Sequence, residues 1–323
     1  MNMTGVRQME KVGVVWTGCP GDADAFERAL RLCYRTKAAL SIVAAMERSP
    51  TPIIDRPSVW GPVSGTTDVN EDRPAELRRL IEMARRENVQ TSCEVLQGDD
   101  SLELFDRIKK EGCDIVVKAA QPLTLAQRTY FGHADDRFLR MSPCSVWITK
   151  PSGNSGRKRI LAAVDAAPSY GQFDADSIRK DLDRAVIEFA VLAAQIEEAD
   201  LQVVNVWEFD LELPLQSRAG FAPAGVAEVE TTLRQKHERS LTQLLAPYNR
   251  RISRVHLLKG NAANEVARLA TNESIDAIVM GTVSRSGIAG WLFGNTAEKV
   301  LIQSECSLVT VKPCRFSSRD CAL

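Results

Sequence analysis

Apolar residues along the chain fall into short unbroken runs that alternate with longer segments of helical periodicity. In the second half of the chain these runs lie at 160–164, 201–207, 254–258, 277–280 and 308–311. They are rich in β-branched residues and lack clean alternation, as expected for strands covered on both faces. Helices are predicted near 181–197, 225–246, 261–272 and 295–304. Strands that alternate with helices in this way predict a parallel sheet with right-handed crossovers.

The first half repeats this order of elements, with helices predicted near 23–37, 72–88, 99–111 and 133–141. When the chain is slid by 162 positions, residues 96–151 align with 258–313 without a gap and share 14 identities in 56 positions. Unrelated segments of ordinary composition would share about one residue in sixteen to twenty. The first strands match at an offset of 148, so the second half has gained about 14 residues near 168–180. The sequence therefore predicts a duplicated domain.

The duplication sets the predicted domain boundaries. The first domain covers 1–151, a Gly/Ser-rich linker covers 152–156, the second domain covers 157–314, and a tail covers 315–323. A segment of this linker's composition is expected to be flexible. The predicted fold class is α/β, and each domain is expected to hold a five-stranded parallel sheet of order 3-2-1-4-5 with helices on both faces.

Charge and cysteine usage narrow the range of partners. The net charge is -1, with 41 basic and 42 acidic residues, so no strong field attracts nucleic acid or an acidic membrane. The eight cysteines form no C-x-x-C pair, which argues against zinc and thioredoxin-like sites. The longest apolar run, 185–196, is too short to span a bilayer. We therefore expect a cytoplasmic protein with reduced thiols, no nucleic-acid partner and no membrane insertion.

A candidate ligand site follows from the predicted strand order. In an open parallel sheet a ligand binds at the carboxyl ends of the strands where the order reverses, which here is between the first and fourth strands. In the second half the first strand leads into Asp165 and Ala166, and the fourth leads into Gly281. A Gly-rich segment then runs to a predicted helix start at Asn295. Glycines let backbone N–H groups approach a phosphate, and a helix start favours an anion.

At this point the chain resembles the universal stress protein family, as two tandem copies of an adenine nucleotide alpha hydrolase-like domain. Nucleotide-binding members carry G-x-x-G-x9-G followed by Ser or Thr. This chain has Gly281, Ser284, Gly294 and Asn295 at the corresponding positions, so two of the three glycines match and an amide replaces the hydroxyl group. The resemblance implies that ATP or AMP is bound, once per chain.

The resemblance also implies individual roles in nucleotide binding. Asp165 would contact the adenine and ribose end, and Val206 would line the nucleoside, while Arg285 could add a charge-assisted contact to phosphate. The candidate nucleotide residues are Asp165, Ala166, Val206, Gly281, Val283, Ser284, Arg285, Gly294, Asn295 and Thr296.

Two of these residues also have roles that need no ligand. Asn295 and Glu298 resemble a capping box, in which both side chains bond to the backbone at a helix start. Asp165 could likewise cap the turn that follows the first strand. Both alternatives stay open at the level of sequence.

The first half lacks the candidate site. Thr17 aligns with Asp165, Ala119 with Gly281, and Pro122, which has no N–H group, with Ser284. His133 stands opposite Asn295, where a helix-start role is favoured over that of a base. Gly132 alone does not make a phosphate loop, so the first half is expected to be a packing partner.

A second candidate site is apolar. Large apolar side chains follow the second strand of the second half and recur in the Gly-rich segment, at Phe209, Leu211, Phe221, Trp291 and Phe293. One interpretation is that they form the seam between the two halves. The other is that they line a pocket for an acyl chain or another amphiphile.

Catalytic motifs are missing from the sequence. The three histidines bear no relation to a nucleophile, and there is no G-x-x-x-x-G-K-[ST], G-x-S-x-G or H-E-x-x-H motif. The leading hypothesis is a stress-response protein that binds ligands and signals without catalysis, although a slow ATPase is left open. The alternatives are a carrier or sensor of an apolar ligand in the second half, and a protein that acts only through interactions because its site has collapsed.

The final strand of each half is predicted to be a sheet edge. An open apolar edge invites aggregation unless it is covered. In related dimers this edge pairs with its partner, so we expect the strands at 145–149 and 308–312 to pair within the chain as a pseudo-dimer, with Trp147 near Val309. The sequence does not specify whether whole chains also form homodimers.

Overall fold

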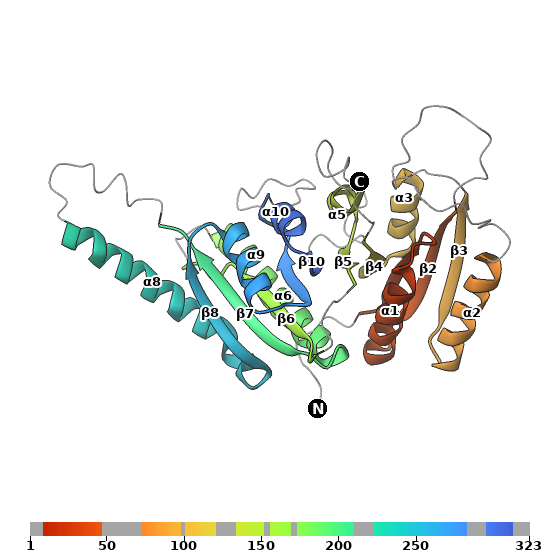
Figure 1. The fold of residues 1–323 in the computed structure, drawn as a ribbon, viewed down its shortest axis with the longest axis horizontal. Helices are drawn as coiled ribbons and strands as arrows, with labels where there is room; N and C mark the ends of the chain where they lie inside the picture. Colours follow the sequence, from red (N-terminus) through yellow and green to blue (C-terminus); the bar gives the residue numbers. More distant parts are fainter. Residues whose placement is uncertain are drawn as a thin grey trace. The chain divides into compact units, whose positions relative to one another are not determined.

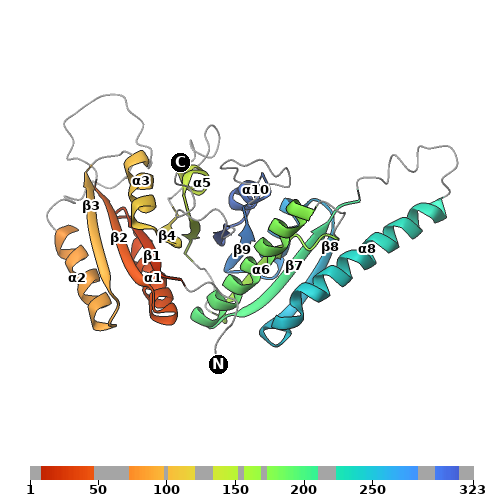
Figure 2. The same cartoon turned by 180° about the vertical axis from the view of Figure 1, so that it is seen from behind.

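The computed structural model describes residues 9–46, 73–97, 101–120, 134–151, 156–168, 173–209, 223–282 and 295–312 of the 323-residue chain. The chain folds into two compact units. Unit 1 comprises the residues up to Pro151 and the segment from Ser307, and unit 2 comprises Ser152–Cys306. Within each unit, helices lie on both faces of a mostly parallel sheet (Figures 1 and 2).

Unit 1 contains all five strands of the first copy. They are β1 (Lys11–Trp16), β2 (Ala39–Met46), β3 (Thr91–Gln97), β4 (Ile115–Ala119) and β5 (Ser145–Thr149). All four pairings between neighbours are parallel, in the order β3-β2-β1-β4-β5, which confirms the predicted topology. The two central strands are almost entirely buried, so the core follows β1 and β4.

The helices of unit 1 cover the two faces of its sheet as the crossover rule requires. They are α1 (Asp22–Thr36), α2 (Arg73–Arg86), α3 (Ser101–Glu111) and α5 (Ala134–Met141). Right-handed crossovers put α1 and α2 on one face and α3 and α5 on the other. The shared face of α3 and α5 is marked by Phe105 and Phe138, whose ring centroids are 5.3 Å apart.

Unit 2 has the same arrangement. Its strands β6 (Arg159–Val164), β7 (Asp200–Trp207), β8 (Ile252–Lys259) and β9 (Ala277–Gly281) are parallel in the order β9-β6-β7-β8. Its helices are α6 (Phe173–Ile196), α8 (Pro223–Leu245), α9 (Ala262–Asn272) and α10 (Asn295–Gln303), with a 3₁₀ turn at Ala246–Arg251.

The extra residues of the second copy lengthen its first helix. The sequence predicts a helix near 181–197, whereas α6 begins at Phe173 because no proline or glycine interrupts the segment after Gly171. The offset between the copies is 148 at the first strand and 162 from residue 96 onward, and between these segments, in α1 and the second strand, it is 161. This offset pairs Asp22 with Asp183. It also pairs Lys37 (φ 62°) with Glu198 (φ 51°), the left-handed residues that follow the two helices.

The repeated acidic residues hold the amino ends of the strands. Asp114 accepts hydrogen bonds from the backbone N of Glu10 (2.7 Å) and Lys11 (3.0 Å), and Asp276 accepts one from the N of Arg159 (2.8 Å). Because each aspartate precedes the fourth strand and bonds to the first, it fixes the register of these two strands. This role explains why the residue is identical in both copies.

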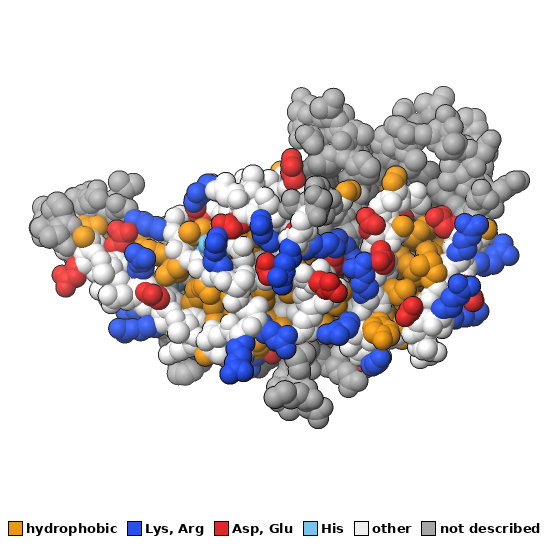
Figure 3. Space-filling model, turned by 60° about the horizontal axis from the view of Figure 1, so that its bottom comes forward, with side chains coloured by type: hydrophobic (Ala, Val, Ile, Leu, Met, Phe, Trp, Pro, Cys, Tyr) orange, Lys and Arg blue, Asp and Glu red, His pale blue; other side chains and the backbone are white. Residues whose placement is uncertain are grey.

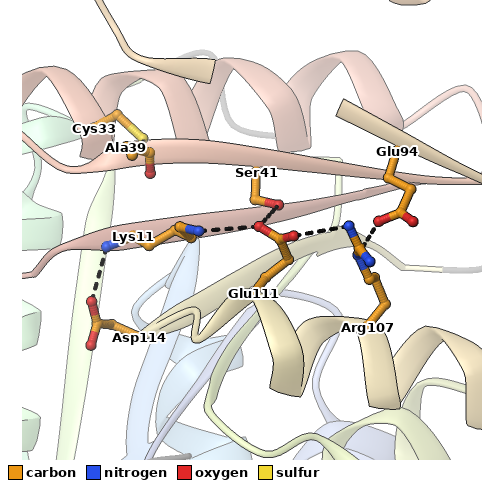
Figure 4. A network of polar contacts seen from close by, with 8 residues as sticks. All are labelled: Lys11, Cys33, Ala39, Ser41, Glu94, Arg107, Glu111 and Asp114. Carbon is orange, nitrogen blue, oxygen red and sulfur yellow. Dashed lines mark hydrogen bonds and ion pairs between the residues drawn. The ribbon is translucent and has the colours of Figure 1, made fainter. Parts of the chain in front are cut away.

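Glu111 and Glu273, another identical pair, organise the polar groups beside the sheet. Glu111 accepts hydrogen bonds from Lys11 Nζ (3.1 Å) and Ser41 Oγ (3.2 Å), and it pairs with Arg107, which also contacts Glu94 (Figure 4). Its counterpart Glu273 has other partners. Its carboxylate accepts hydrogen bonds from the side chains of Gln202 (3.4 Å) and Arg254 (2.8 Å), and its backbone carbonyl accepts one from Arg159 Nη1 (2.7 Å). The duplicated identities therefore serve the scaffold.

The last strand of the sequence, β10 (Ser307–Val311), pairs with β5 in antiparallel orientation, and Val309 lies opposite Trp147. This confirms the predicted strand pairing. Two equivalent bonds close the ladder, from Lys150 N to Ser307 Oγ (3.0 Å) and from Lys312 N to Ser145 Oγ (3.1 Å). The repeat assigns β10 to the second domain, whereas its contacts place it in unit 1.

Charged side chains of both signs are exposed on the described surface. On the face drawn in Figure 3, Lys and Arg side chains are interspersed with Asp and Glu. The six described cysteines are free, and Cys33, Cys113 and Cys144 are buried. In the described part of the chain, no helix combines the length and the apolar character needed to cross a membrane.

Candidate functional site

Each copy has one position where the strand order reverses. In unit 1 it lies between β1 and β4, where Val15 is in register with Lys118. In unit 2 it lies between β6 and β9, where Ala163 is in register with Met280. We call the residues at and just beyond the carboxyl ends of these strands the two mouths. The first mouth is Thr17–Cys19 with Lys118 and Ala119, and the second mouth is Asp165–Ala167 with Gly281 and Thr282.

The backbone of the second mouth is fixed by two charged residues of α6. Asp183 Oδ1 accepts a hydrogen bond from Asp165 N at 2.8 Å. Arg179 Nη1 donates to the carbonyl oxygens of Asp165 and Ala167, each at 2.7 Å, and its Nη2 donates to Asp176 at 3.1 Å. Arg179 comes from the additional turns of α6, so the extra residues of the second copy shape its mouth.

Asp183 is a buried carboxyl group with a strongly shifted pKa. Its exposed fraction is 5%. Burial raises its pKa to about 7, the nearby Asp165 carboxylate adds to this increase, and the Asp165 N–H and Arg179 oppose it. Asp22, its counterpart, accepts hydrogen bonds from the N–H groups of Thr17 (2.6 Å), Gly18 (2.7 Å) and Cys19 (3.1 Å). Burial also raises the pKa of Asp22, while these bonds oppose the shift.

A buried polar pair, Asn205 and His237, contacts the end of β6 just before the second mouth. Asn205 is fully buried in β7 and donates from Nδ2 to the carbonyl of Val164 at 3.0 Å. Its Oδ1 lies 3.3 Å from Nδ1 of the buried His237 on α8. The amide oxygen only accepts, so this contact requires a proton on His237 Nδ1. Ala44 occupies the Asn205 position in the first copy, so this pair belongs to unit 2.

Gly281 has a packing role that the sequence analysis did not include. It ends β9, and a Cβ atom there would lie 2.5 Å from Leu182 Cδ2 on α6. In unit 1 the glycine is on the helix and the larger residue is on the strand, because Gly21 is equivalent to Leu182 and Ala119 is equivalent to Gly281. A Cβ on Gly21 would lie 3.1 Å from that of Ala119. The glycine thus fits the helix, and its φ is not in the left-handed region.

The first mouth contains a buried ion pair. Lys118 Nζ donates to Asp135 Oδ1 at 2.7 Å and to the carbonyl of Ala119 at 2.8 Å. Lys118 has an exposed fraction of 0% and Asp135 of 5%. Asp135 lies in the first turn of α5, just after the segment that aligns with the Gly-rich segment of the second copy. The equivalent residues of the second copy are Met280 and Ala297, which carry no charge.

The structure brings several predicted nucleotide residues to the same edge of unit 2. Asp165 and Ala166 follow β6, Gly281 ends β9, and Val206 is buried near the end of β7. Helix α10 begins at Asn295 as predicted, with Thr296 half-buried in its first turn. Four predicted residues lie outside the described part of the chain: Val283, Ser284, Arg285 and Gly294.

The apolar candidates are described only in part. Phe209 is buried in a cluster with Trp207 on β7 and Val226 on α8. The other four, Leu211, Phe221, Trp291 and Phe293, lie outside the described residues, as do Pro122, Gly132 and His133 of the first copy. Among the described residues, no group of three or more His, Cys, Asp or Glu side chains is arranged to hold a metal ion.

Sequence reasoning missed the residues that fix and fill the two mouths. They are Arg179, Asp183, Asn205 and His237 in unit 2 and Lys118 and Asp135 in unit 1. One signal was available for two of them: a lysine and an asparagine interrupt the apolar runs Ile115–Ala119 and Leu201–Trp207. A polar residue within a buried strand requires a partner, so it marks a site to investigate.

The chain contains a doubly wound α/β domain twice, and each copy has one position where the strand order reverses. These features define the class of protein. The Usp model, described as the universal stress protein family, matches residues 9–150 and 156–312. The chain therefore belongs to the universal stress protein family and carries two copies of its domain.

Individual relatives agree with this assignment. Universal stress protein E of Escherichia coli K12 is 26% identical over 220 residues, which cover 67% of this chain and 66% of that protein, somewhat under two thirds of its length. Universal stress protein A homolog 1 of Coxiella burnetii is 29% identical over 154 residues, 48% of this chain and 95% of that protein. A functionally unknown protein of Pseudomonas aeruginosa PAO1 has the same fold, with a TM-score of 0.71, 22% identity and coverage of 96% of this chain and 95% of that one.

Proposed function

We propose that the chain is a stress-response protein that acts by binding and signalling, and that its second domain binds one ATP or AMP at the second mouth. The observation that carries the proposal is the difference between the two mouths. In the first mouth Lys118 and Asp135 form a buried charge pair, whereas the residues equivalent to this pair in the second copy, Met280 and Ala297, carry no charge.

The groups around Asp165 support a nucleotide as the ligand. Asp183 accepts the N–H group of Asp165 and Arg179 donates to its carbonyl oxygen, so the half-exposed Asp165 side chain starts from a defined position. Thr282 follows β9 at the same edge of the sheet, and α10 begins at Asn295 after the Gly-rich segment. A helix start presents N–H groups to a phosphate, and a carboxylate accepts hydrogen bonds from ribose hydroxyl groups.

Melting of the full chain with ATP and with AMP tests the proposal. A ligand that binds only the folded state raises the melting temperature, and the increase grows with its concentration. We expect this increase for the unchanged chain and for Thr17→Ala, which alters the aligned position of unit 1. Asp165→Ala should lose most of it. Isothermal titration calorimetry should give about one nucleotide per chain.

Other outcomes would separate the alternatives. An absence of any nucleotide shift in the unchanged chain would refute the proposal. An equal shift in Asp165→Ala would place the nucleotide elsewhere. Native mass spectrometry of protein purified without added ligand should show no bound amphiphile. A co-purified lipid would favour the apolar ligand, for which Phe209 would be the first residue to alter.

A further inference from the structure

We propose that Asp135 is a resident anion of the first domain, held by Lys118 in the place where the second domain would receive the anionic part of a ligand. The proposal concerns the first mouth, which the proposed nucleotide site does not include. Its comparison with the second mouth rests on the proposed function, but its test does not use a nucleotide.

Position is the first argument. Asp135 lies in the first turn of α5, and a carboxylate there interacts favourably with the unpaired N–H groups and the positive end of the helix dipole. Lys118 occupies the next-to-last position of β4, beside β1. The pair therefore joins the two structural parts that form an anion site in open α/β sheets, a strand end at the switch point and a helix start.

Charge and burial are the second argument. The ammonium group is fully buried, 2.7 Å from Asp135, and it lies 5.9 Å from the ring centroid of Phe138. Removing both ions from water costs free energy that their attraction only partly returns, so such a pair is weak support for a purely stabilising role. An electrostatic contribution from Lys118 also acts on Asp22, which holds the backbone of the first mouth. The cation thus lies among groups that organise this mouth.

The second copy supplies the third argument. Ala297, which stands for Asp135, is 1% exposed, and Met280, which stands for Lys118, is 6% exposed. The acidic residue in the first turn of α10 is Glu298, which is half-buried and corresponds to Asp136. The two copies share their scaffold, but a charged pair in the first copy is an apolar pair in the second. The residues at positions 118 and 135 therefore decide whether a side chain of the domain itself occupies its anion site.

Chemical rescue tests the proposal. Asp135→Ala leaves the Lys118 ammonium buried at a helix start without its carboxylate, so the melting temperature should fall. Sodium formate should then raise it by about 2–4 °C more than sodium chloride at equal ionic strength, because formate replaces the missing carboxylate. The unchanged chain should show no difference between the two salts.

The matched control is Lys118→Met combined with Asp135→Ala, which reproduces the residues of the second copy. This double variant lacks the cation at position 118 and should not distinguish formate from chloride. If Asp135→Ala is recovered poorly, Asp135→Ser removes the same carboxylate and is compared in the same two salts. No formate-specific increase in either single variant, or an equal increase in the double variant, would overturn the proposal. A formate effect without nucleotide binding would overturn the proposed function alone.

Discussion

The two mouths occupy the same place on duplicated scaffolds, yet different charged side chains surround them. In the first mouth each of these charged groups has a partner within the domain: Asp22 accepts hydrogen bonds from three backbone N–H groups, and Lys118 forms a buried ion pair with Asp135. In the second mouth Asp183 accepts the backbone N–H group of Asp165, and Arg179 reaches the strand end from the additional turns of α6. Asp114 and Asp276 keep the same role at the amino ends of the strands, whereas the side chains of the two mouths differ.

This comparison shows where each copy uses its identical residues. Asp114 and Asp276 fix strand registers, and Ser145 and Ser307 close the β5–β10 ladder. None of these residues belongs to a mouth. These identities between the duplicated domains therefore belong to their common scaffold, and the two mouths differ at positions that do not match.

The largest expected effect comes from moving the buried cation to the second mouth. Met280→Lys places an ammonium group at a position that is 6% exposed, where Ala297 offers no carboxylate. A buried charge without a partner costs about 3–5 kcal/mol of unfolding free energy. Adding Ala297→Asp should return a large part of this loss. Urea denaturation of both variants measures the effect.

Lys118→Met is the reciprocal control, since it leaves the Asp135 carboxylate buried without its cation. If Met280→Lys alone were as stable as the unchanged chain, water would have to reach position 280. The second mouth would then be more open than its burial indicates, and the contrast between the mouths would lie in solvation and not in charge.

A smaller effect is expected at the contact between strand and helix. Gly281→Ala places a methyl group 2.5 Å from Leu182 Cδ2, so the leucine must move, at a cost of about 1–3 kcal/mol. Leu182→Ala should make the same change at Gly281 nearly neutral. A double-mutant cycle measured by urea denaturation isolates this coupling.

The equivalent cycle in unit 1 is Gly21→Leu with Ala119→Gly, which installs the size order of unit 2. The double variant should be more stable than Gly21→Leu alone. Additive costs in both cycles would show that the exchanged sizes are unrelated. Coupling in both cycles would show that Gly281 is required by its contact with Leu182. The glycine alone would then not support a nucleotide site, and other residues of the second mouth would have to do so.

The outline of the fold is readable from the sequence because strands and helices have strong hydrophobic periods and because the repeat supplies each prediction twice. The start of α6 was placed too late, since the segment from Phe173 has no counterpart in the first copy. The polar groups of the mouths were not predictable in the same way. Asp183 is 18 positions from Asp165, and Asp135 is 17 positions from Lys118, so only the folded chain shows that each pair meets.

The smallest expected effect is a difference in pH dependence. The pKa of Asp183 is about 7 in the folded chain, against an ordinary value of 3.8, so the folded state binds its proton more tightly than the unfolded state. Stability therefore falls as the pH rises from about 4 to about 7 and is then constant with respect to this group. At about 1.4 kcal/mol per pH unit, the change between pH 5.5 and 7 is at most about 2 kcal/mol.

Asp183→Asn removes this titration and keeps an oxygen that accepts the Asp165 N–H group. The stability of the variant relative to the unchanged chain should therefore increase from pH 5.5 to pH 7.5, as measured by urea denaturation at each pH. Asp24→Asn makes the same chemical change at an exposed position of α1, and its relative stability should vary less over this range. Parallel behaviour of the two variants would mean that Asp183 ionises as a solvated carboxyl group does. Water would then reach Asp183 on α6, and the second mouth would not contain a carboxyl group that burial keeps protonated.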